Sequence, residues 1–327
     1  MKVLVTGGAG YIGSVTADHL VQAGYEVVVL DNLGNGHREA VPEQAEFVEG
    51  DIHDRALLKD LFLRGFDGVL HFAAFIEAGE SMQNPTKFFE NNVVGSHILL
   101  SEVINAQVPH FIFSSTAAVY KSKDELLMEA DEIQPANVYG QTKRMIEEML
   151  EWYAKTQGLK TSIFRYFNAA GASLLETPPK RGEQHDPESH IIPNLLKVAK
   201  GEREAFTLFG EDYPTPDGTC VRDYIHVDDL ANAHLLGLDK LSSGEIDFEV
   251  FNLGNGQGFS NKEVVDTALK VTGQEIKIIV EGRREGDAPR LVASSDKAKQ
   301  LLGWQPQYPD LETIISSAWE WERTNAH

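Results

Sequence analysis

Tyr139 and Lys143 stand four residues apart in the segment 139–143 (YGQTK). Residues at this spacing share one face of a helix, so the phenol and the ammonium would point the same way. A phenol titrates near pH ~10, so it acts as a base at neutral pH only when nearby positive charge lowers its pKa. Taken alone, such a pair is typical of a solvated helix surface. The alternative is a tyrosine general base assisted by lysine. We expect this helix to bury the side chains of Met145, Ile146, Met149 and Leu150.

A hydroxyl group is predicted close to this pair. The segment 113–116 (FSST) ends an apolar run, and a strand there would place Thr116 at the carboxyl edge of a sheet. Thr116 could then share a proton network with Tyr139 and a substrate hydroxyl. The alternative role for Thr116 is a helix cap or a turn.

Glycines at the amino terminus indicate a phosphate-binding loop. Gly7, Gly10 and Gly13 follow a short apolar run and precede a helix-period segment that ends near Gly24, and Gly8 completes a second pattern, G-x-G-x-x-G. Glycines let the backbone turn tightly and approach a pyrophosphate, whose charge the helix amino terminus stabilises. The alternative is a glycine-rich turn without a ligand.

An acidic residue supports the prediction of a dinucleotide site and indicates which dinucleotide binds there. Asp31 closes the second apolar run, 21 residues after Gly10, where a carboxylate accepts from a ribose 2′-hydroxyl and repels a 2′-phosphate. NAD is therefore expected rather than NADP, and its oxidised ring would add positive charge beside Tyr139. Asp51 and Ile52 could border the adenine, although Asp51 would serve equally well as a helix cap.

The elements that hold these residues follow a regular pattern, because the first half of the chain alternates apolar runs with helix-period segments. Right-handed crossovers between such runs build a doubly wound parallel sheet. The fold class is therefore α/β, with a Rossmann domain and a smaller mixed α/β substrate lobe. The expected strands cover residues 3–6, 27–31, 47–49, 68–73, 111–115 and 162–167.

The texture changes after Asn168, where the turn-rich segments 177–182 and 213–218 separate helical stretches. We expect a Rossmann domain over 1–168 and a substrate-binding lobe mainly over 169–327, with some of its segments returning to pack on the Rossmann sheet. Ligands bind at the carboxyl ends of parallel strands, so the active site is expected in the cleft between the two parts.

Composition excludes several classes of protein. The 327 residues are 42% hydrophobic and carry 29 basic against 50 acidic side chains, a net charge of −21, which argues against a nucleic-acid or membrane partner. No apolar run reaches the length of a signal peptide or a membrane span. Cys220 is the one cysteine, so we expect no disulfide, no metal site and a cytoplasmic location.

With these residues assembled, the sequence resembles the extended short-chain dehydrogenase/reductase family, and within it the nucleotide-sugar 4-epimerases, over nearly its whole length. The segments that carry the resemblance are 5–14 (VTGGAGYIGS), 30–33 (LDNL), 49–52 (EGDI), 79–81 (GES), 91–93 (NNV), 165–168 (RYFN), 218–227 (GTCVRDYIHV) and 283–287 (RREGD).

The resemblance implies a tightly held NAD and no net redox change. Tyr139 would take the proton of the sugar 4-hydroxyl while hydride passes from C4 to the nicotinamide, and the 4-ketosugar would turn and take the hydride back on its other face. UDP-glucose and UDP-galactose would thereby interconvert. The resemblance places the cofactor against Gly7, Gly10, Tyr11, Ile12, Gly13, Asp31, Asn32, Asp51, Ile52, Phe72, Ala73, Ala74, Asn91, Ser114, Tyr139, Lys143, Tyr166 and Phe167.

The resemblance also implies a UDP-sugar site. Thr116 and Tyr139 would touch the sugar, while Phe209 would line the uridine pocket, and permanently charged arginines suit a diphosphate on an otherwise acidic chain. Without the resemblance, Arg283 and Arg284 would be interpreted as a solvated charge pair. The remaining expected contacts are Asn168, Arg222, Arg284 and Asp287, with His190 and Ile191 as weaker matches.

Four positions depart from the family pattern. Thr116 replaces a frequent serine without losing the hydroxyl. Lys121 stands where glycine is common, and Ile76 where some relatives carry a lysine near the nicotinamide ribose, which would leave more of that task to Lys143. Leu291 aligns with a gate that is tyrosine in some epimerases, so N-acetylated or other UDP-sugars stay open as substrates.

The sequence also bears on activities other than epimerisation. A sugar-nucleotide 4,6-dehydratase needs an acid and a base after the strand-five threonine, and Ala117 and Ala118 stand there instead. Decarboxylation stays open because it needs only a carboxylate-bearing substrate and a 4-keto intermediate. A silent NAD-binding sensor is disfavoured by the intact Tyr139 and Lys143. By resemblance, the chain would form a homodimer through helices of the large domain.

Overall fold

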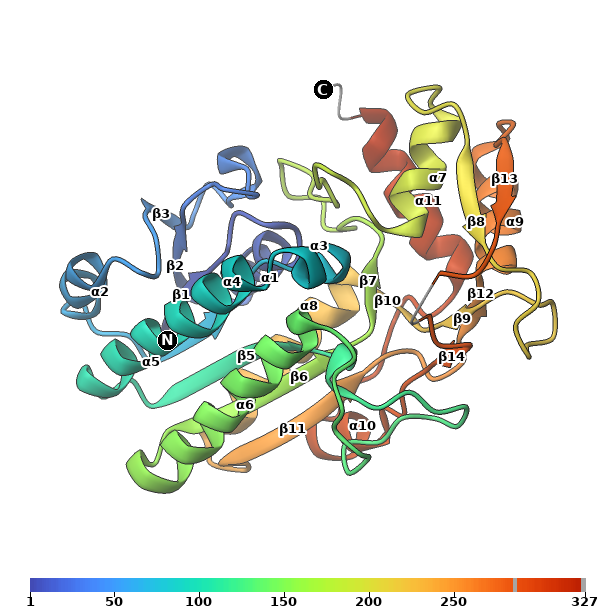
Figure 1. Cartoon of the computed structure of the whole chain (residues 1–327). Coiled ribbons are helices and arrows are strands. Elements are labelled where there is room, and N and C mark those ends of the chain that lie inside the picture. Colours follow the sequence, from blue (N-terminus) through green and yellow to red (C-terminus); the bar gives the residue numbers. More distant parts are fainter. Residues whose placement is uncertain (285–286, 325–327) are drawn as a thin grey trace.

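The computed structural model describes residues 1–284 and 287–324. Its centre is a sheet of seven parallel strands in the order β11-β6-β5-β4-β1-β2-β3 (Figure 1). The predicted α/β fold class is therefore confirmed. The strands of this sheet are β1 (Lys2–Thr6), β2 (Glu26–Asp31), β3 (Glu46–Glu49), β4 (Gly68–His71), β5 (His110–Thr116), β6 (Lys160–Tyr166) and β11 (Phe248–Leu253).

The strand order reverses between β1 and β4, and this reversal sets where a ligand can bind. Val3, Leu4 and Val5 of β1 are fully buried because both faces of the sheet are covered, and β1 pairs in register with β2 and β4. At the reversal the crossover connections leave in opposite directions, which opens a crevice at the carboxyl ends of β1 and β4.

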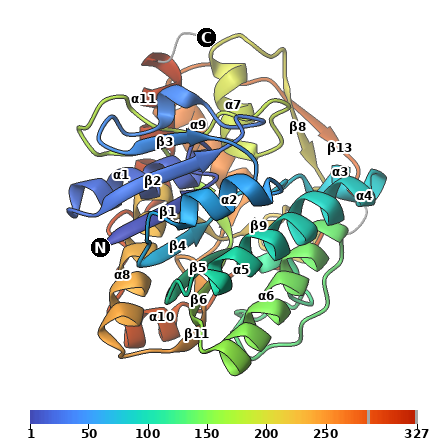
Figure 2. The ribbon, with the colours of Figure 1, turned by 90° about the vertical axis from the view of Figure 1, so that its left-hand side faces the viewer.

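Helices cover the two faces of the sheet (Figure 2). One face packs Leu20 of α1 and Leu238 of α8, and the other packs Leu100 of α5 and Leu150 of α6. The helices on the first face are α1 (Tyr11–Gln22), α8 (Val227–Ser243) and α10 (Asp296–Leu302). Those on the second face are α2 (Arg55–Phe62), α5 (Gly95–Asn105) and α6 (Val138–Gln157).

A second, smaller core lies beyond the carboxyl edge of the sheet. It buries Leu195, Val264 and Ile315 from three helices, which stand together beside β8 and β13 (Figure 1). Its elements are β7 (Asn168–Ala170), α7 (Ile191–Ala199), β8 (Phe206–Phe209), β9 (Val221–Arg222), β10 (Tyr224–His226), β12 (Phe259–Ser260), α9 (Asn261–Thr272), β13 (Ile278–Glu281), β14 (Arg290–Leu291) and α11 (Leu311–Thr324).

Short helices connect the sheet to its surroundings. The stretch Phe89–Val94 is a π-helix that leads directly into α5, and π-turns are frequent at functional sites. The other short helices are Arg38–Ala40, α3 (Ala78–Gln83), α4 (Pro85–Phe88) and Ala117–Val119.

All six predicted strands form, with ends that differ by a residue or two. The fourth strand stops at His71, two residues before its predicted end, so that Phe72 and Ala73 leave the sheet and enter the crevice. β11 and α8 come from beyond residue 168 and pack on the large sheet. In the described part of the chain, no helix has the length and apolarity needed to cross a bilayer.

Candidate functional site

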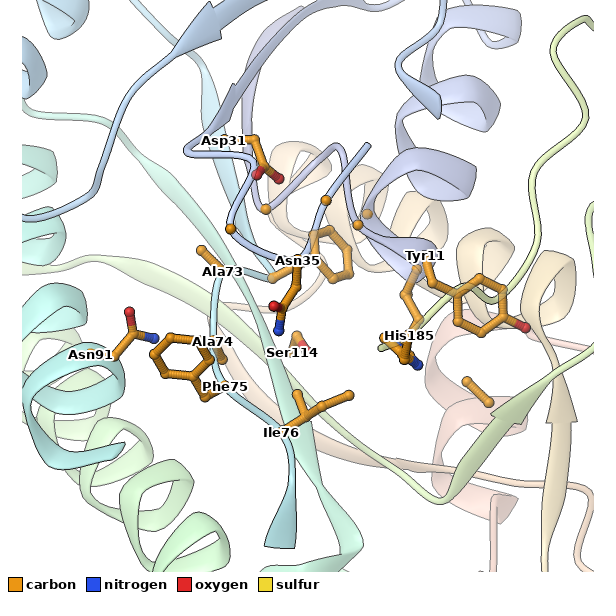
Figure 3. Close-up of a pocket in the computed structure, with 18 of the residues that line it drawn as sticks. Tyr11, Asp31, Asn35, Ala73, Ala74, Phe75, Ile76, Asn91, Ser114 and His185 are labelled. Atoms are coloured by element: carbon orange, nitrogen blue, oxygen red, sulfur yellow. The ribbon is translucent and has the colours of Figure 1, made fainter. Parts of the chain in front are cut away.

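A cavity of about 350 Å³ opens at the carboxyl ends of β1, β2, β4, β5 and β6 (Figure 3). It brings together all the residues expected to hold the cofactor, together with Thr116, Asn168 and His190 from the expected substrate contacts. The expected residues in its wall are Gly7, Gly10, Tyr11, Ile12, Gly13, Asp31, Asn32, Asp51, Ile52, Phe72, Ala73, Ala74, Asn91, Ser114, Thr116, Tyr139, Lys143, Tyr166, Phe167, Asn168 and His190.

The glycine loop forms a close-fitting cradle in this wall. Gly7 has φ +72°, and a Cβ there would lie 2.5 Å from the backbone nitrogen of Ala73. A Cβ on Gly13 would lie 2.2 Å from the Gly7 carbonyl oxygen. Gly10 precedes α1 and has no side chain to cap its first turn, so the amides there are available to a pyrophosphate. The loop fits a dinucleotide.

Asp31 lies at the end of β2 with its carboxylate directed toward the glycine loop (Figure 3). Its two oxygens accept hydrogen bonds from the amides of Ala9 and Leu33, each at 2.9 Å. These bonds hold the carboxylate in the cavity wall, where each oxygen keeps lone pairs for a ribose hydroxyl.

Asp51 does not cap a helix. The cap of α2 is Asp54, whose side chain accepts from the amides of Ala56 and Leu57. Asp51 instead accepts from Asn32 Nδ2 at 2.7 Å and from His53. Burial opposes its ionisation, but these hydrogen bonds hold the pKa of Asp51 below its ordinary value. Of the two roles considered for Asp51, only the one at the cavity remains.

The start of α6 is fixed tightly, which positions the Tyr139 side chain. Asn137 caps the helix by accepting from the Gly140 amide at 2.8 Å, and the Tyr139 amide donates to Ser81 Oγ at 3.1 Å. A Cβ on Gly140 would lie 2.4 Å from the Ala118 carbonyl oxygen, so glycine lets the helix approach the end of β5.

Tyr139 and Lys143 lie on one face of α6, as their spacing predicted. Lys143 Nζ is 6.0 Å from the centre of the Tyr139 ring and 5.0 Å from that of Phe113. It donates to the Ser114 carbonyl oxygen at 2.8 Å. Lys143 is 2% exposed, so the pair belongs to the cavity wall and the solvated-surface alternative is wrong.

The electrostatics differ from expectation, because the chain alone does not make the phenol acidic. Burial raises the pKa of Tyr139 to about 12, and a hydrogen bond with Thr116 opposes this rise only in part. Burial also lowers the pKa of Lys143 to about 7. Desolvation disfavours both charged forms, and the ammonium is directed at a carbonyl rather than at the phenol. A base at Tyr139 would therefore need positive charge beyond that of the side chains around it.

Thr116 caps a helix, and its hydroxyl also contacts Tyr139, as a shared proton network would require. Its hydroxyl oxygen accepts from the Ala118 amide at 3.1 Å and so caps the short helix Ala117–Val119. The same hydroxyl hydrogen-bonds the Tyr139 side chain and lines the cavity. The Thr116 oxygen accepts from the Ala118 amide, which fixes the side-chain rotamer. The hydroxyl proton stays free to be donated to Tyr139.

A buried ion pair fastens α6 to the sheet beneath the site. Arg165 of β6 donates to both carboxylate oxygens of Glu147, at 2.9 Å and 2.6 Å, and Ser115 Oγ donates to the same carboxylate at 2.6 Å. Glu147 takes an inward position, which leaves Met145 and Met149 only half-buried, whereas Ile146 and Leu150 are buried as expected.

A second group of expected substrate contacts gathers outside the cavity wall. Asp287 lies between Arg284, at 3.0 Å, and Arg222, at 3.6 Å. The Arg284 guanidinium stacks over the Phe209 ring at 4.9 Å. Arg283 instead pairs with exposed Asp212. Ile191 begins α7 and is absent from the cavity wall. Glu285 and Gly286 of the motif 283–287 lie outside the described residues.

Asn168 connects the cavity to this group. It lines the cavity, and its side chain donates to the Asp223 carbonyl oxygen at 2.8 Å, beside Arg222 and next to the pairing of β7 with β10.

The cavity wall also contains residues that sequence reasoning missed. Phe75 and Ile76 continue the chain past β4, and Asn35 lies in the loop after β2 (Figure 3). A signal existed for two others, since Glu183 and His185 begin the pattern E-x-H-x-x-E-x-H. The missed residues are Leu30, Gly34, Asn35, Gly36, Gly50, Phe75, Ala169, Glu183 and His185, whereas the position of Ile76 was expected near the nicotinamide ribose.

Comparisons with known proteins agree with this geometry. Residues 3–254 match the NAD dependent epimerase/dehydratase family. The chain is 47% identical over 333 residues to a UDP-glucose 4-epimerase of Halalkalibacterium halodurans, covering 100% of this chain and 97% of the relative.

Solved structures are similar over the whole chain. A UDP-glucose 4-epimerase structure superposes with a TM-score of 0.94 at 49% identity, covering 99% of this chain and 98% of the other. The Brucella ovis UDP-glucose 4-epimerase in complex with NAD gives 0.93 at 42% identity, covering 98% and 97%.

Proposed function

The chain belongs to the NAD dependent epimerase/dehydratase family, and from that premise we propose that it interconverts UDP-glucose and UDP-galactose with bound NAD. The observation that carries the proposal is the placement of Tyr139, Lys143 and Thr116 in the same cavity as the glycine cradle. A dinucleotide along the cradle would bring its reactive ring toward these three side chains at the ends of β5 and α6.

Bound NAD would supply a hydride acceptor, and then a hydride donor, together with a cationic ring. Tyr139 takes the proton of the sugar 4-hydroxyl in the first half of the reaction and returns it in the second. Thr116, hydrogen-bonded to Tyr139, orients the phenol and the substrate hydroxyl. The Lys143 amine is held near the Tyr139 ring by its hydrogen bond to the Ser114 carbonyl oxygen, and its protonated form would add positive charge there. Together these groups favour the phenolate at the moment when proton transfer requires it.

Inversion requires that the sugar turn while the nucleotide stays bound. The group of Phe209, Arg222, Arg284 and Asp287 lies apart from the cavity wall, which suits a uridine and diphosphate anchor remote from the reacting carbon. Contacts to the uridine diphosphate are the same for both sugars, so they bind either substrate equally well. The loosely held keto sugar can then turn and present both faces. We propose Ile191 and His190 as weaker contacts of this same substrate.

The positions that depart from the family pattern bear on which sugar the site accepts. Leu291 packs against the same buried cluster as Phe167, which lines the cavity, and a leucine side chain is smaller than the tyrosine of some relatives. UDP-N-acetylhexosamines are therefore the second substrates we propose. Ile76 lines the cavity, whereas Lys121 pairs with Glu132 at 2.9 Å on the exposed surface.

We propose further that the chain forms a homodimer through helices of the large domain. The support is Trp152 on α6, an aromatic side chain of which 66% is exposed. Sedimentation of the wild-type protein and of Trp152→Glu tests this. A dimer that the substitution dissociates is expected, and a wild-type monomer would contradict it.

The function is tested by incubating the purified protein with UDP-galactose and separating the products by chromatography and mass. UDP-glucose of unchanged mass is expected, together with UDP-N-acetylglucosamine from UDP-N-acetylgalactosamine. A product lighter by water or carbon dioxide, the latter from UDP-glucuronate, would indicate a dehydratase or a decarboxylase. Absence of turnover with NAD bound would indicate a sensor.

A further inference from the structure

Two histidines and two glutamates meet in the segment that leads into α7. Glu183, His185, Glu188 and His190 each offer one nitrogen or oxygen atom, and these four atoms lie within 4.8 Å of one another. Glu183, His185 and His190 also line the cavity, and Figure 3 shows His185 in its wall. The proposed catalytic groups do not use this cluster, and of its four residues only His190 was proposed as a weaker substrate contact.

Contacts between histidine nitrogens and carboxylate oxygens hold the cluster together. His190 Nδ1 is 2.6 Å from Glu183 Oε1 and 3.2 Å from Glu188 Oε1. His185 Nδ1 is 3.2 Å from Glu183 Oε1 and 3.8 Å from Glu188 Oε2. A tetrahedron with metal–ligand bonds of about 2.1 Å has edges of about 3.4 Å, so around an ion the 2.6 Å contact would open and the 3.8 Å contact would close.

One buried atom of the cluster has no hydrogen-bond partner. Glu188 Oε1 accepts from the amides of Ser189 and His190, each at 2.7 Å, but Oε2 accepts no hydrogen bond although the side chain is only 3% exposed. A buried carboxylate oxygen without a donor is costly, and a bound cation removes that cost. This atom is aimed at the cluster, 3.8 Å from His185 Nδ1.

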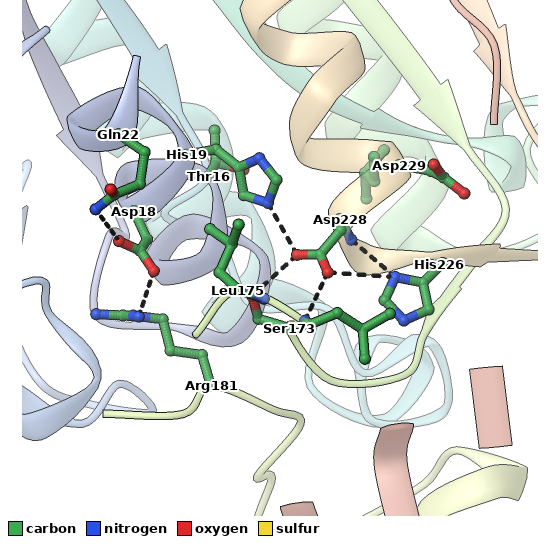
Figure 4. Close-up of polar contacts among 12 residues, drawn as sticks. Thr16, Asp18, His19, Gln22, Ser173, Leu175, Arg181, His226, Asp228 and Asp229 are labelled. Atoms are coloured by element: carbon green, nitrogen blue, oxygen red, sulfur yellow. Dashed lines mark hydrogen bonds and ion pairs between the residues drawn. The ribbon is translucent and has the colours of Figure 1, made fainter. Parts of the chain in front are cut away.

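The segment before the cluster is held in place on the Rossmann side. Arg181 pairs with Asp18 of α1 at 2.6 Å, with both side chains 1% exposed, and Asp228 of α8 accepts from Ser173 Oγ and from the Leu174 amide (Figure 4). The segment after it begins α7 at Ile191. Because both ends of the segment 183–190 are held, a bound cation would have to pay little conformational entropy to order it.

We propose that Glu183, His185, Glu188 and His190 bind one Zn²⁺ ion, which closes residues 183–190 into a fixed loop in the cavity wall. Imidazole nitrogens together with carboxylate oxygens suit zinc, whereas Mg²⁺ and Ca²⁺ take oxygen ligands. Two neutral histidines and two carboxylates balance the charge of the ion. Four protein ligands leave no open position, so the ion is structural and does not enter the reaction. The expectation of no metal site is thereby revised.

A competing arrangement uses the same residues without a metal. Burial disfavours charge on the histidines, but the neighbouring carboxylates, Glu183 foremost, hold the pKa values of His185 and His190 above their ordinary value. Protonated histidines would then pair with the two glutamates. The two arrangements carry the same net charge, and metal content distinguishes them.

The experiment measures metal content and is independent of turnover. The full chain is stripped with a chelator, incubated with ZnCl₂ in the presence of excess Mg²⁺, dialysed and analysed by plasma mass spectrometry. About one zinc per chain is expected for the wild type and for His97→Ala, a control at an exposed histidine of α5. The double substitution His185→Ala/His190→Ala and the single Glu188→Gln should each lose at least nine-tenths of it.

Cobalt gives a signature that adventitious binding does not. Co²⁺ in the wild type should show the intense visible bands of a four-coordinate ion, which the Glu188→Gln variant should lack, with circular dichroism confirming that the variant is folded. Zinc should also raise the Tm of the wild type but not of Glu188→Gln. Zinc bound equally by wild type and the double variant, or no retained zinc in the wild type, would overturn the proposal.

Discussion

Lys143 Nζ lies 6.0 Å from the centre of the Tyr139 ring and donates its 2.8 Å hydrogen bond to the Ser114 carbonyl. The Lys143 amine is therefore held near the ring by a carbonyl, and with its pKa lowered to about 7 it is only partly charged at neutral pH. Because burial raises the pKa of Tyr139 to about 12, the base is assembled only when a cationic ring joins this arrangement.

Replacing Tyr139 by phenylalanine removes the proton acceptor and keeps the packing of the ring. We expect kcat for UDP-galactose to fall about 10²- to 10⁴-fold, the range of a general base, with little change in KM. The matched control is Tyr153→Phe, the same change on the half-buried side of α6, which should keep its activity. Near wild-type turnover by Tyr139→Phe would exclude the proposed base.

Thr116 offers a pair of variants that separate the hydroxyl from the shape of the side chain. Thr116→Ser keeps the oxygen that accepts from Ala118 and contacts Tyr139, so its kcat should stay within a few-fold of wild type. Thr116→Val keeps the shape and removes the oxygen, which should cost about 1 to 3 kcal/mol of transition-state stabilisation. Equal rates for the two variants would show that the hydroxyl has no part in proton transfer.

Glu147 and Arg165 test what holds α6 in place. Glu147 is fully buried and Arg165 is 3% exposed, so Glu147→Gln leaves a buried guanidinium without its charge partner and should lower the free energy of unfolding by about 3 to 5 kcal/mol. Glu148→Gln on the same helix removes a half-exposed carboxylate that pairs with Arg144, and should cost about 0 to 1 kcal/mol. Urea denaturation of both variants measures the difference, and comparable losses would contradict the prediction.

His234 should give the fold part of its acid sensitivity. Burial lowers its pKa from 6.5 to about 4. As the pH falls through 6.5, the unfolded chain takes up a proton that the folded chain refuses, so stability present above pH 6.5 is lost progressively toward about pH 4. His234→Gln should flatten the slope of unfolding free energy against pH in this window by about 1.4 kcal/mol per pH unit.

His97→Gln, at an exposed position, is the control for that slope. His226 is shifted in the same direction, by burial above all, so a slope remains in the His234 variant. An unchanged slope in His234→Gln would mean that this histidine titrates normally in the folded chain.

Asp31 is predicted to decide between the two nicotinamide dinucleotides. Asp31→Asn keeps an oxygen for the Ala9 or Leu33 amide and removes the charge that repels a 2′-phosphate. We expect the preference for NAD over NADP, measured by calorimetry, to narrow about tenfold or more, equivalent to about 1.4 kcal/mol. An unchanged preference would place the selection elsewhere in the cavity.

The sequence predicted those parts of the site whose geometry depends on residues close together in the chain. Gly7 and Gly13 are needed within one turn of chain, and Tyr139 and Lys143 are related by the helix period, so their spacing carries the information. The strands were predictable for the same reason, since each buried run is continuous in sequence.

Features that depend on distant partners could not be predicted from the sequence. Glu147 has the composition of a surface position, and only the approach of Arg165 from β6 explains why it is buried in place of Met145. Asp51 and Asp54 are equivalent caps by sequence, and their difference arises from the contact of Asp51 with Asn32. The depressed pKa of Lys143 likewise follows from burial that no local pattern reveals.

The central claim is that hydride leaves C4 of the sugar and returns to the same carbon with Tyr139 as the base. UDP-galactose carrying deuterium at C4 tests it directly. We expect UDP-glucose that keeps the deuterium at C4 in ordinary water, with slower conversion than for the unlabelled sugar where hydride transfer limits the rate. UDP-glucose that has exchanged its C4 deuterium for solvent hydrogen would contradict the account.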